Sequence, residues 1–334
     1  MKKLKAAILG LGMVGYEFSL DKKRKGVWSH FDAIQNNKNL TLEAVVDLRP
    51  NMCKSFETKF GINAYTNVEQ MFDQHDIDFV SICTPAHVHY ENILSAIKHS
   101  VKIIFCEKPI CIDLKQAEKV VKLCKQKNVI LGVNHNRRWE TPYIKVSEFL
   151  KEGKLGDFRS SQVHYSGHVF NSGTHVIDAI MMLTGKTIAR VSGISHDKSM
   201  SDPHISGLLE FEDGNLCHLV CNQLREDLIY EWEIIGSEGR IKILDNGLKT
   251  EYSFFKESRN YSGFRELSTA KKLPLGKHKD RMIAAFDNLV RAYYKKEPAV
   301  RCDGVDGFNA ASVAEALKKS SLSNGKWTQV KVFK

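Results

Sequence analysis

Short apolar runs alternate with amphipathic segments along the first 135 residues of the chain. The apolar runs cover residues 4–9, 42–46, 78–83, 101–106 and 129–133. Apolar residues at helical spacing fill residues 28–34, 51–60, 68–74, 89–98 and 114–127. Strands that alternate with helices in this way form a parallel sheet covered on both faces. We therefore predict an α/β fold that begins with a doubly wound parallel sheet.

The second half of the chain has a different pattern, in which strands follow one another with few helices between them. We expect strands at residues 158–165, 189–196, 204–212, 215–224, 230–236 and 240–245, and helices at 171–183, 278–295 and 307–320. Asp213-Gly214 and Asn246-Gly247 are typical of hairpin turns. This pattern predicts a large, mostly antiparallel open sheet with helices on one face. A chain of 334 residues has room for two domains, which we place at residues 1–125 and 126–334.

A glycine-rich turn, Gly10-Leu-Gly12-Met13-Val14-Gly15, follows the first predicted strand. In a dinucleotide-binding turn the first glycine permits the tight bend and the second lets the backbone approach a pyrophosphate. The third glycine allows close helix packing. The helix that follows such a turn directs its N-terminus at the phosphates. The turn therefore predicts a Rossmann domain, and Met13 and Val14 belong to the same cofactor-binding segment.

Asp47 stands at the end of the second predicted strand, where a carboxylate accepts hydrogen bonds from the adenosine ribose and repels a 2′-phosphate. This indicates NAD as the cofactor, while Arg49 leaves NADP as the alternative. The spacing from Gly15 to Asp47 is longer than the usual 20 or so residues. We therefore predict an insertion at residues 16–27, which includes four consecutive cations, residues 22–25. They form either a solvated loop or a flap over the cofactor that meets anionic groups.

Charge and cysteine content narrow the class of protein. The net charge is +10, but Lys and Arg are dispersed and no nucleic-acid motif is visible, so we expect affinity for anionic small molecules and not for nucleic acid. The eight cysteines lie largely in apolar runs without a CxxC pair, which is typical of reduced core thiols in a cytoplasmic protein. No apolar stretch approaches the roughly 20 residues of a membrane span.

Several polar residues follow the predicted parallel strands, at the edge of the sheet where doubly wound folds bind ligands. They are Asp47, Thr84, Glu107, Lys108 and Asn134. His87 and His89 near Cys83 lack further ligands at a telling spacing, so no metal site is predicted.

The order and spacing of five motifs resemble those of the Gfo/Idh/MocA oxidoreductase family over nearly the whole chain. The motifs are the glycine turn, Thr84-Pro85-Ala-His-Val-His89, Glu107-Lys108-Pro109, Asn136-Arg137-Arg138 and Gly173-Thr-His175-Val-Ile-Asp178. The resemblance implies hydride transfer between a nicotinamide and a carbinol carbon of a sugar, cyclitol or sugar nucleotide. It also implies that Pro85 and His89 belong to the loop beneath the cofactor.

Such a reaction needs a cation near the substrate oxygen and a group that exchanges its proton. The resemblance assigns these roles to Lys108 and His175. His175 and Asp178 are spaced i,i+3 on one predicted helix, so Asp178 is expected to orient the imidazole. Many family members have Asp four residues before this histidine, whereas this chain has Asn171. An amide takes no proton, so Asn171 is expected to position the substrate or His175.

Arg137 and Arg138 are candidates for clamping a carboxylate or phosphate of the substrate, and the alternative for either is an ion pair with an acidic residue. Substrate specificity is expected in the loops at residues 195–202 and 256–275. The family also implies a homodimer or homotetramer formed through the open sheet.

The sequence therefore predicts an NAD-dependent oxidoreductase acting on a sugar or sugar nucleotide, with surface-polysaccharide biosynthesis as a setting implied by resemblance alone. An inositol or aldose dehydrogenase fits the same residues. Two alternatives keep the fold and change the role. One is a cofactor-binding sensor without turnover, which Asn171 favours. The other is an enzyme in which tightly held NAD is reduced and reoxidised within one cycle, giving epimerisation, elimination or glycoside cleavage.

Overall fold

The chain divides into two units in the computed structural model, which describes residues 3–195, 197, 200–224, 226–275, 280–297 and 299–333. The first unit comprises Met1–Trp139 and Lys279–Phe308, and the second comprises Glu140–His278 and Asn309–Lys334. The border predicted after residue 125 falls inside helix α5 (Leu114–Gln126). The structure groups the segment up to Trp139 with the first unit, because the last parallel strand lies beyond that border.

The first unit is built on a six-stranded parallel sheet in the order β3-β2-β1-β4-β5-β6. Its strands are β1 (Leu4–Leu9), β2 (Leu40–Val46), β3 (Asn63–Tyr65), β4 (Phe79–Ile82), β5 (Ile103–Cys106) and β6 (Ile130–Val133). Strands β4 and β5 are buried throughout, as expected for a sheet covered on both faces. The predicted doubly wound sheet is confirmed, with β3 as a short additional edge strand.

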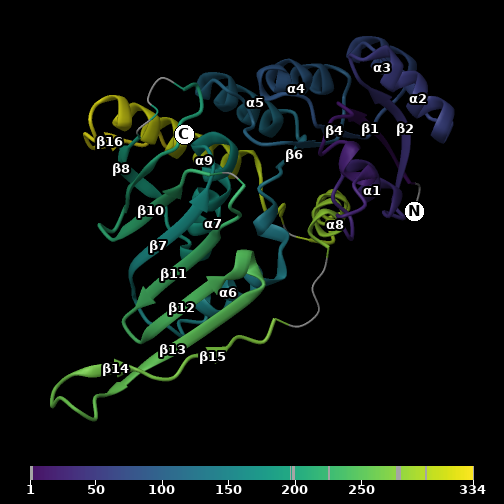
Figure 1. The fold of residues 1–334 in the computed structure, drawn as a ribbon. Helices are drawn as coiled ribbons and strands as arrows, with labels where there is room; N and C mark the ends of the chain where they lie inside the picture. The colour runs from purple at the N-terminus through teal and green to yellow at the C-terminus, as the bar shows by residue number, and fades with distance from the viewer. Residues whose placement is uncertain are drawn as a thin grey trace. The chain divides into compact units, whose positions relative to one another are not determined.

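Helices cover both faces of this sheet. They are α1 (His30–Gln35), α2 (Pro50–Phe60), α3 (Val68–Gln74), α4 (His89–Lys98), α5 and α8 (Arg281–Tyr293), with short 3-10 turns η1 (Glu17–Leu20), η2 (Ala86–Val88) and η3 (Asn136–Trp139). Within this unit, Figure 1 shows α3, α4 and α5 on one side of the strands and α1 and α8 on the other. Helix α8 comes from the end of the chain, and Asp280 caps its first turn by accepting from the amides of Met282 and Ile283.

The insertion after the glycine turn loops out of a helix. The amides of His30 and Phe31 donate to the carbonyls of Val14 and Gly15, at 2.9 and 3.0 Å, so α1 continues directly from the glycine turn. The helix predicted to resume at residue 28 therefore begins at His30, with Ser29 as its N-cap. Once residues 16–29 are looped out, the spacing from Gly15 to Asp47 becomes the usual one for this kind of fold.

The second unit contains a ten-stranded sheet in the order β14-β13-β12-β11-β7-β10-β9-β8-β16, with β15 paired to β13. Its strands are β7 (Phe158–Ser166), β8 (Ile188–Ile194), β9 (Ser206–Phe211), β10 (Leu216–Asn222), β11 (Tyr230–Gly236), β12 (Gly239–Leu244), β13 (Lys249–Glu257), β14 (Arg265–Leu267), β15 (Lys271–Lys272) and β16 (Thr328–Gln329). A 3-10 turn, η5 (Asp245–Gly247), lies between β12 and β13. The pairing is antiparallel except between β7 and β10, which run parallel in the middle of the sheet.

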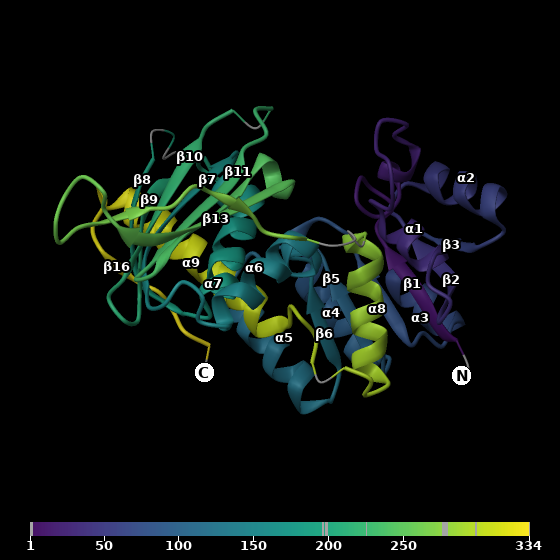
Figure 2. The same cartoon turned by 90° about the horizontal axis from the view of Figure 1, so that it is seen from below.

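Three helices cover one face of this sheet: α6 (Thr141–Lys151), α7 (Thr174–Thr184) and α9 (Gly304–Leu322), as Figure 2 shows. Their apolar residues share one core with the strands, in which Phe149, Ile180 and Leu317 pack near Val163 and Trp232. Helix α6 and strands β13 to β16 were not predicted. The expected loop at 256–275 therefore includes the end of β13 and two short strands.

Candidate cofactor and substrate site

The glycine turn has the shape that a dinucleotide requires. Gly10 has φ +95°, and a Cβ there would lie 2.8 Å from the carbonyl oxygen of Cys83. A Cβ on Gly15 would lie 2.1 Å from the carbonyl oxygen of Gly10. Gly12 differs, because a Cβ there would meet nothing within 4 Å. Two of the glycines are therefore needed by the protein's own packing, and the middle one faces open space, as a backbone approached by a pyrophosphate should.

Asp47 follows β2 and connects it to the glycine turn. Its Oδ2 accepts from the backbone amide of Leu11 at 2.9 Å, and its Oδ1 accepts from the amide of Arg49 at 3.0 Å. The guanidinium of Arg49 adds hydrogen bonds of 2.8 Å to Oδ1 and 3.0 Å to Oδ2. Burial alone would raise the pKa of Asp47, but the Arg49 hydrogen bonds hold that pKa below its usual range. Asp47 is therefore an ionised acceptor at the position predicted for the ribose.

Glu107 is buried at the end of β5, where three donors hold its carboxylate. Its Oε1 accepts from His30 Nε2 at 3.0 Å and from Asn134 Nδ2 at 2.6 Å, and its Oε2 accepts from the Lys108 amide at 3.3 Å. Nδ1 of His30 also bonds the hydroxyl of Ser81. Two of the predicted residues, Glu107 and Asn134, are thus brought together beside the start of α1. Lys108 follows this fixed carboxylate and is half-buried.

His89 connects the turn at Thr84 and Pro85 to the turn at Lys108 and Pro109. Its Nδ1 lies 2.9 Å from the carbonyl oxygen of Pro109, and its Nε2 lies 2.7 Å from that of Thr84. Burial lowers the pKa of His89, and a neutral imidazole donates to only one of these oxygens at a time. Asn92 adds a hydrogen bond from its Nδ2 to the Thr84 hydroxyl at 2.9 Å. His89 therefore holds the turn at Thr84 and Pro85 against the segment that carries Lys108.

Two neighbouring arginines, Arg137 and Arg138, lie in η3. Arg138 donates to the carbonyl of Arg301 at 2.8 Å and forms an ion pair with Asp306 at 2.9 Å. The alternative expected for these arginines, an ion pair with an acidic residue, therefore applies to Arg138. Arg137 is half-buried in the same turn, and its role as a substrate clamp stays a prediction.

In the second unit, a π-helical turn, η4 (Val169–Gly173), precedes α7 and carries Asn171. The helix predicted at residues 171–183 is therefore two elements. His175 lies in the first turn of α7 and is half-buried, whereas Asp178 is fully buried. The carboxylate of Asp202 accepts from the amides of Phe170 and Asn171 at 2.8 and 3.0 Å. It holds the turn in place from the loop at 195–202, of which residues 196, 198 and 199 lie outside the described residues.

Sequence reasoning missed His30, Glu17 and Asp202. His30 is a polar residue on the buried side of α1, a weak signal that was available. Glu17 contacts Arg49, and Asp202 contacts the backbone amides of η4. Both contacts join residues far apart in the sequence, so no local sequence pattern predicts them.

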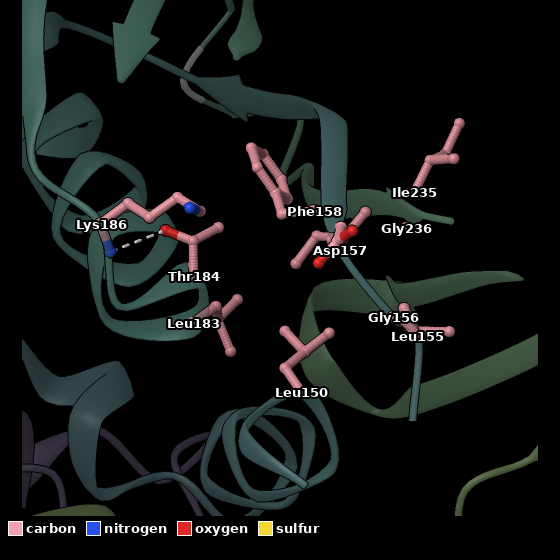
Figure 3. Close-up of a pocket in the computed structure, with 11 residues that line it drawn as sticks. Leu150, Leu155, Gly156, Asp157, Phe158, Leu183, Thr184, Lys186, Ile235 and Gly236 are labelled. Atoms are coloured by element: carbon pink, nitrogen blue, oxygen red, sulfur yellow. Dashed lines mark hydrogen bonds between the residues drawn. The ribbon is translucent and has the colours of Figure 1, made fainter. Parts of the chain in front are cut away.

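A pocket of about 230 Å³ in the second unit lies at the opposite end of α7 from His175. Figure 3 shows Leu150, Leu183 and Phe158 around it. Its rim includes Lys186, whose amide donates to the Thr184 hydroxyl at 3.3 Å and whose ammonium forms an ion pair with Asp213. None of the predicted site residues lines this pocket.

Three further features of the described residues concern metal binding, membrane spanning and the cysteines. Within the described residues, no group of three or more His, Cys, Asp or Glu side chains has the geometry of a metal site. No helix in the described part of the chain is long and apolar enough to cross a membrane. None of the eight cysteines forms a disulfide, and all except Cys221 are buried.

Comparison with known proteins supports the predicted activity. The NAD-binding Rossmann-fold model of the Gfo/Idh/MocA oxidoreductases matches residues 4–135, and the C-terminal α/β-domain model of the same family matches residues 148–331. A myo-inositol 2-dehydrogenase from Thermotoga maritima is 24% identical over 95% of this chain and 96% of its own. A D-apiose dehydrogenase from Rhizobium rhizogenes is 27% identical over 64% of each chain.

Solved structures share the fold at low sequence identity. A levoglucosan dehydrogenase in complex with NADH and L-sorbose aligns with a TM-score of 0.81 and 18% identity, over 99% of this chain and all of its own. A UDP-N-acetylglucosamine 3-dehydrogenase from Acidithiobacillus ferrooxidans aligns with a TM-score of 0.77 and 16% identity, over 97% of this chain and 99% of its own.

Proposed function

This chain belongs to the Gfo/Idh/MocA family of NAD-binding oxidoreductases, and we propose that it transfers hydride to or from a carbinol carbon of a sugar or nucleotide-linked sugar. The observation that carries the proposal is the C-terminal edge of the parallel sheet. The open glycine turn and the ionised Asp47 at this edge support the binding of a dinucleotide, and the buried Glu107 holds the neighbouring segment that carries Lys108.

The residues of this edge have separate roles toward the cofactor. The nicotinamide ring, when bound, supplies the hydride acceptor or donor at its C4. The glycine turn receives the pyrophosphate, and Asp47 accepts hydrogen bonds from the ribose. The turn at Thr84 and Pro85, held by His89, would support the ring. Glu107 and Asn134 hold the segment that presents Lys108.

Lys108 and His175 handle the proton of the substrate oxygen. Lys108 supplies a positive charge that stabilises the developing alkoxide, and His175 exchanges the proton with it. Asn171 and Arg137 position the substrate, and Asp178 orients the imidazole of His175. Where many family members have Asp, this chain has Asn171, so one negative charge near His175 is missing. The neutral imidazole of His175 is therefore favoured more than it would be with Asp at position 171.

A nucleotide-linked sugar is the finer proposal, and its setting is surface-polysaccharide biosynthesis. Arg137 supports it, because a guanidinium binds phosphate oxygens in a bidentate way. The net charge of +10 also favours anionic substrates. A free polyol such as an inositol, or an aldose, is the competing substrate class. We place the protein in the cytoplasm on the strength of its reduced, buried thiols.

We also propose that a second copy of the chain covers the open face of the ten-stranded sheet. Cross-strand ion pairs such as Arg190–Glu210 and Lys242–Glu233 lie on strands of this sheet, and their side chains are partly exposed. Because these charges are already paired within one copy, a homodimer or homotetramer could cover this face without burying an unpaired charge. Light scattering of the purified chain measures its mass and tests this directly.

The test of the activity is nicotinamide absorbance of the full chain with NAD or NADP and a panel of inositols, free sugars, sugar acids and sugar nucleotides. A spectral change with one substrate class establishes the reaction and identifies that class. Lys108→Met should abolish the change and leave NAD binding in place. Lys102→Met is the matched control, because Lys102 pairs with Asp78 at the opposite end of β5 and its loss should leave turnover unchanged.

Two outcomes would overturn the proposal of a dehydrogenase. Tight NAD binding without a spectral change or product, across the whole panel, would indicate a sensor, the role that Asn171 favours. Product formed without net change in the nicotinamide would indicate an internal redox cycle.

A further inference from the structure

The guanidinium of Arg49 is bound by two carboxylates that come from different parts of the chain. Its Nε and Nη2 donate to Asp47 at 2.8 and 3.0 Å, and its Nη1 donates to Glu17 Oε1 at 2.9 Å. All three guanidinium nitrogens therefore have an acidic partner. Two carboxylates therefore share one guanidinium at the end of β2.

Glu17 belongs to the insertion that loops out of the helix after the glycine turn. Its neighbour Tyr16 is buried and packs edge-on against Phe31 and Phe56, with ring centroids 5.4 and 5.0 Å apart. The far side of the loop is also held, because the amide of Val27 donates to Asp280 Oδ2 at 2.7 Å. Glu17 is thus carried on an anchored segment and not on a free loop tip.

The four cations of the same insertion, residues 22–25, do not take part in the contact with Arg49. Arg24 forms an ion pair with Asp21 at 3.3 Å and lies over the Phe18 ring, and the lysines at positions 22, 23 and 25 are exposed. The residue of the insertion that reaches the predicted ribose position is therefore an anion.

We propose that Glu17 is a cofactor-selectivity residue that makes this site reject NADP by keeping Arg49 paired. Arg49 has the chemistry to bind a 2′-phosphate, since a guanidinium matches phosphate geometry. To bind Arg49, the 2′-phosphate must replace Glu17 as the partner of the guanidinium. Its nearly two negative charges would then lie close to the carboxylates of both Glu17 and Asp47. The 2′-hydroxyl of NAD carries no charge and would donate a hydrogen bond to Asp47. NAD therefore meets no charge repulsion from the two carboxylates.

This inference rests on the proposed function in one respect, the binding of a dinucleotide at the glycine turn. The experiment is a fluorescence titration of the full chain with NADH and, separately, NADPH, which measures binding without any substrate. In Glu17→Gln, Nη1 of Arg49 loses its charged partner. NADPH should then bind about tenfold more tightly, the scale of one charge-assisted hydrogen bond, while NADH affinity changes by less than about twofold.

Asp21→Asn is the matched control, because it removes the same charge from the same insertion without touching Arg49. It should change NADPH affinity far less than Glu17→Gln. Arg49→Met placed on top of Glu17→Gln should cancel the gain. Equal gains in the two single variants would reduce the effect to general electrostatics and overturn the inference, as would unchanged NADPH affinity in Glu17→Gln. Binding of neither dinucleotide by the unaltered chain would instead overturn the proposed function, and the inference with it.

Discussion

Nε2 of His30 lies 3.0 Å from Oε1 of Glu107, and both side chains are buried in the first unit. Burial by itself lowers the pKa of His30, but contacts with Cys83 and Glu107 raise it to about 10. Burial raises the pKa of Glu107, but the hydrogen bond from His30 leads the effects that lower it to about 2. The pair is therefore ionised at neutral pH. It ties the start of α1 to the segment that carries Lys108.

The stability of the protein should depend on this pair over a defined pH range. The Glu107 contribution is present above its ordinary pKa of 4.5 and is lost as the pH falls toward 2. The His30 contribution is present below its ordinary pKa of 6.5 and is lost as the pH rises toward 10. Free energies of urea unfolding should therefore fall between pH 7 and pH 9, and less steeply in His30→Gln. The exposed His87→Gln serves as control, and parallel curves for all three proteins would contradict the prediction.

Removing one partner of the pair should cost more than removing both. Glu107→Gln leaves a buried imidazolium without a counter-charge, and we expect a loss of about 3–5 kcal/mol in the free energy of unfolding. The double variant Glu107→Gln/His30→Gln should recover part of that loss. Chemical denaturation of the four proteins in this cycle measures the coupling. Losses that simply add would mean that the two side chains do not act as an ion pair.

Gly12 and Gly15 should respond differently to the same substitution. Gly15→Ala places a methyl group 2.1 Å from the carbonyl oxygen of Gly10, so the turn must shift and the protein should lose several degrees of Tm. Gly12→Ala meets nothing within 4 Å in the protein and should keep its Tm. It should instead weaken NAD binding about tenfold or more, since the methyl group occupies the approach of the pyrophosphate. Thermal unfolding and NADH titration of both variants check this, and unaltered NADH affinity in Gly12→Ala would count against the assigned turn.

Restoring the carboxylate at position 171 should change the pH dependence of turnover. Asn171→Asp adds a negative charge one turn before His175, which favours the imidazolium. The acidic limb of the kcat profile should then move to higher pH by about one unit or less. Asn171→Ala adds no charge and should lower turnover without this displacement. The measurement is kcat against pH with the substrate found in the panel, and an unmoved limb in Asn171→Asp would place Asn171 away from the imidazole.

The local sequence determined the parallel sheet and the candidate cofactor residues at its edge. Strands such as Phe79–Ile82 are short apolar runs, and the turn after β1 needs glycines at set positions, so each is encoded by adjacent residues. Asp47, Glu107 and Lys108 could be placed because each comes directly after a strand, where the topology of a doubly wound sheet collects side chains.

Tertiary structure alone decided the contacts that give those residues their electrostatics. His30 reaches Glu107, and Glu17 reaches Arg49, across long stretches of sequence, and neither pair has a periodic signature. The same holds for the parallel pairing of β7 with β10 and for the place of α8 in the first unit. These relationships depend on which surfaces remain to be buried once the local elements have formed. The sequence therefore determined which residues stand at the strand ends, and the packed chain determined their partners and hence their charge states.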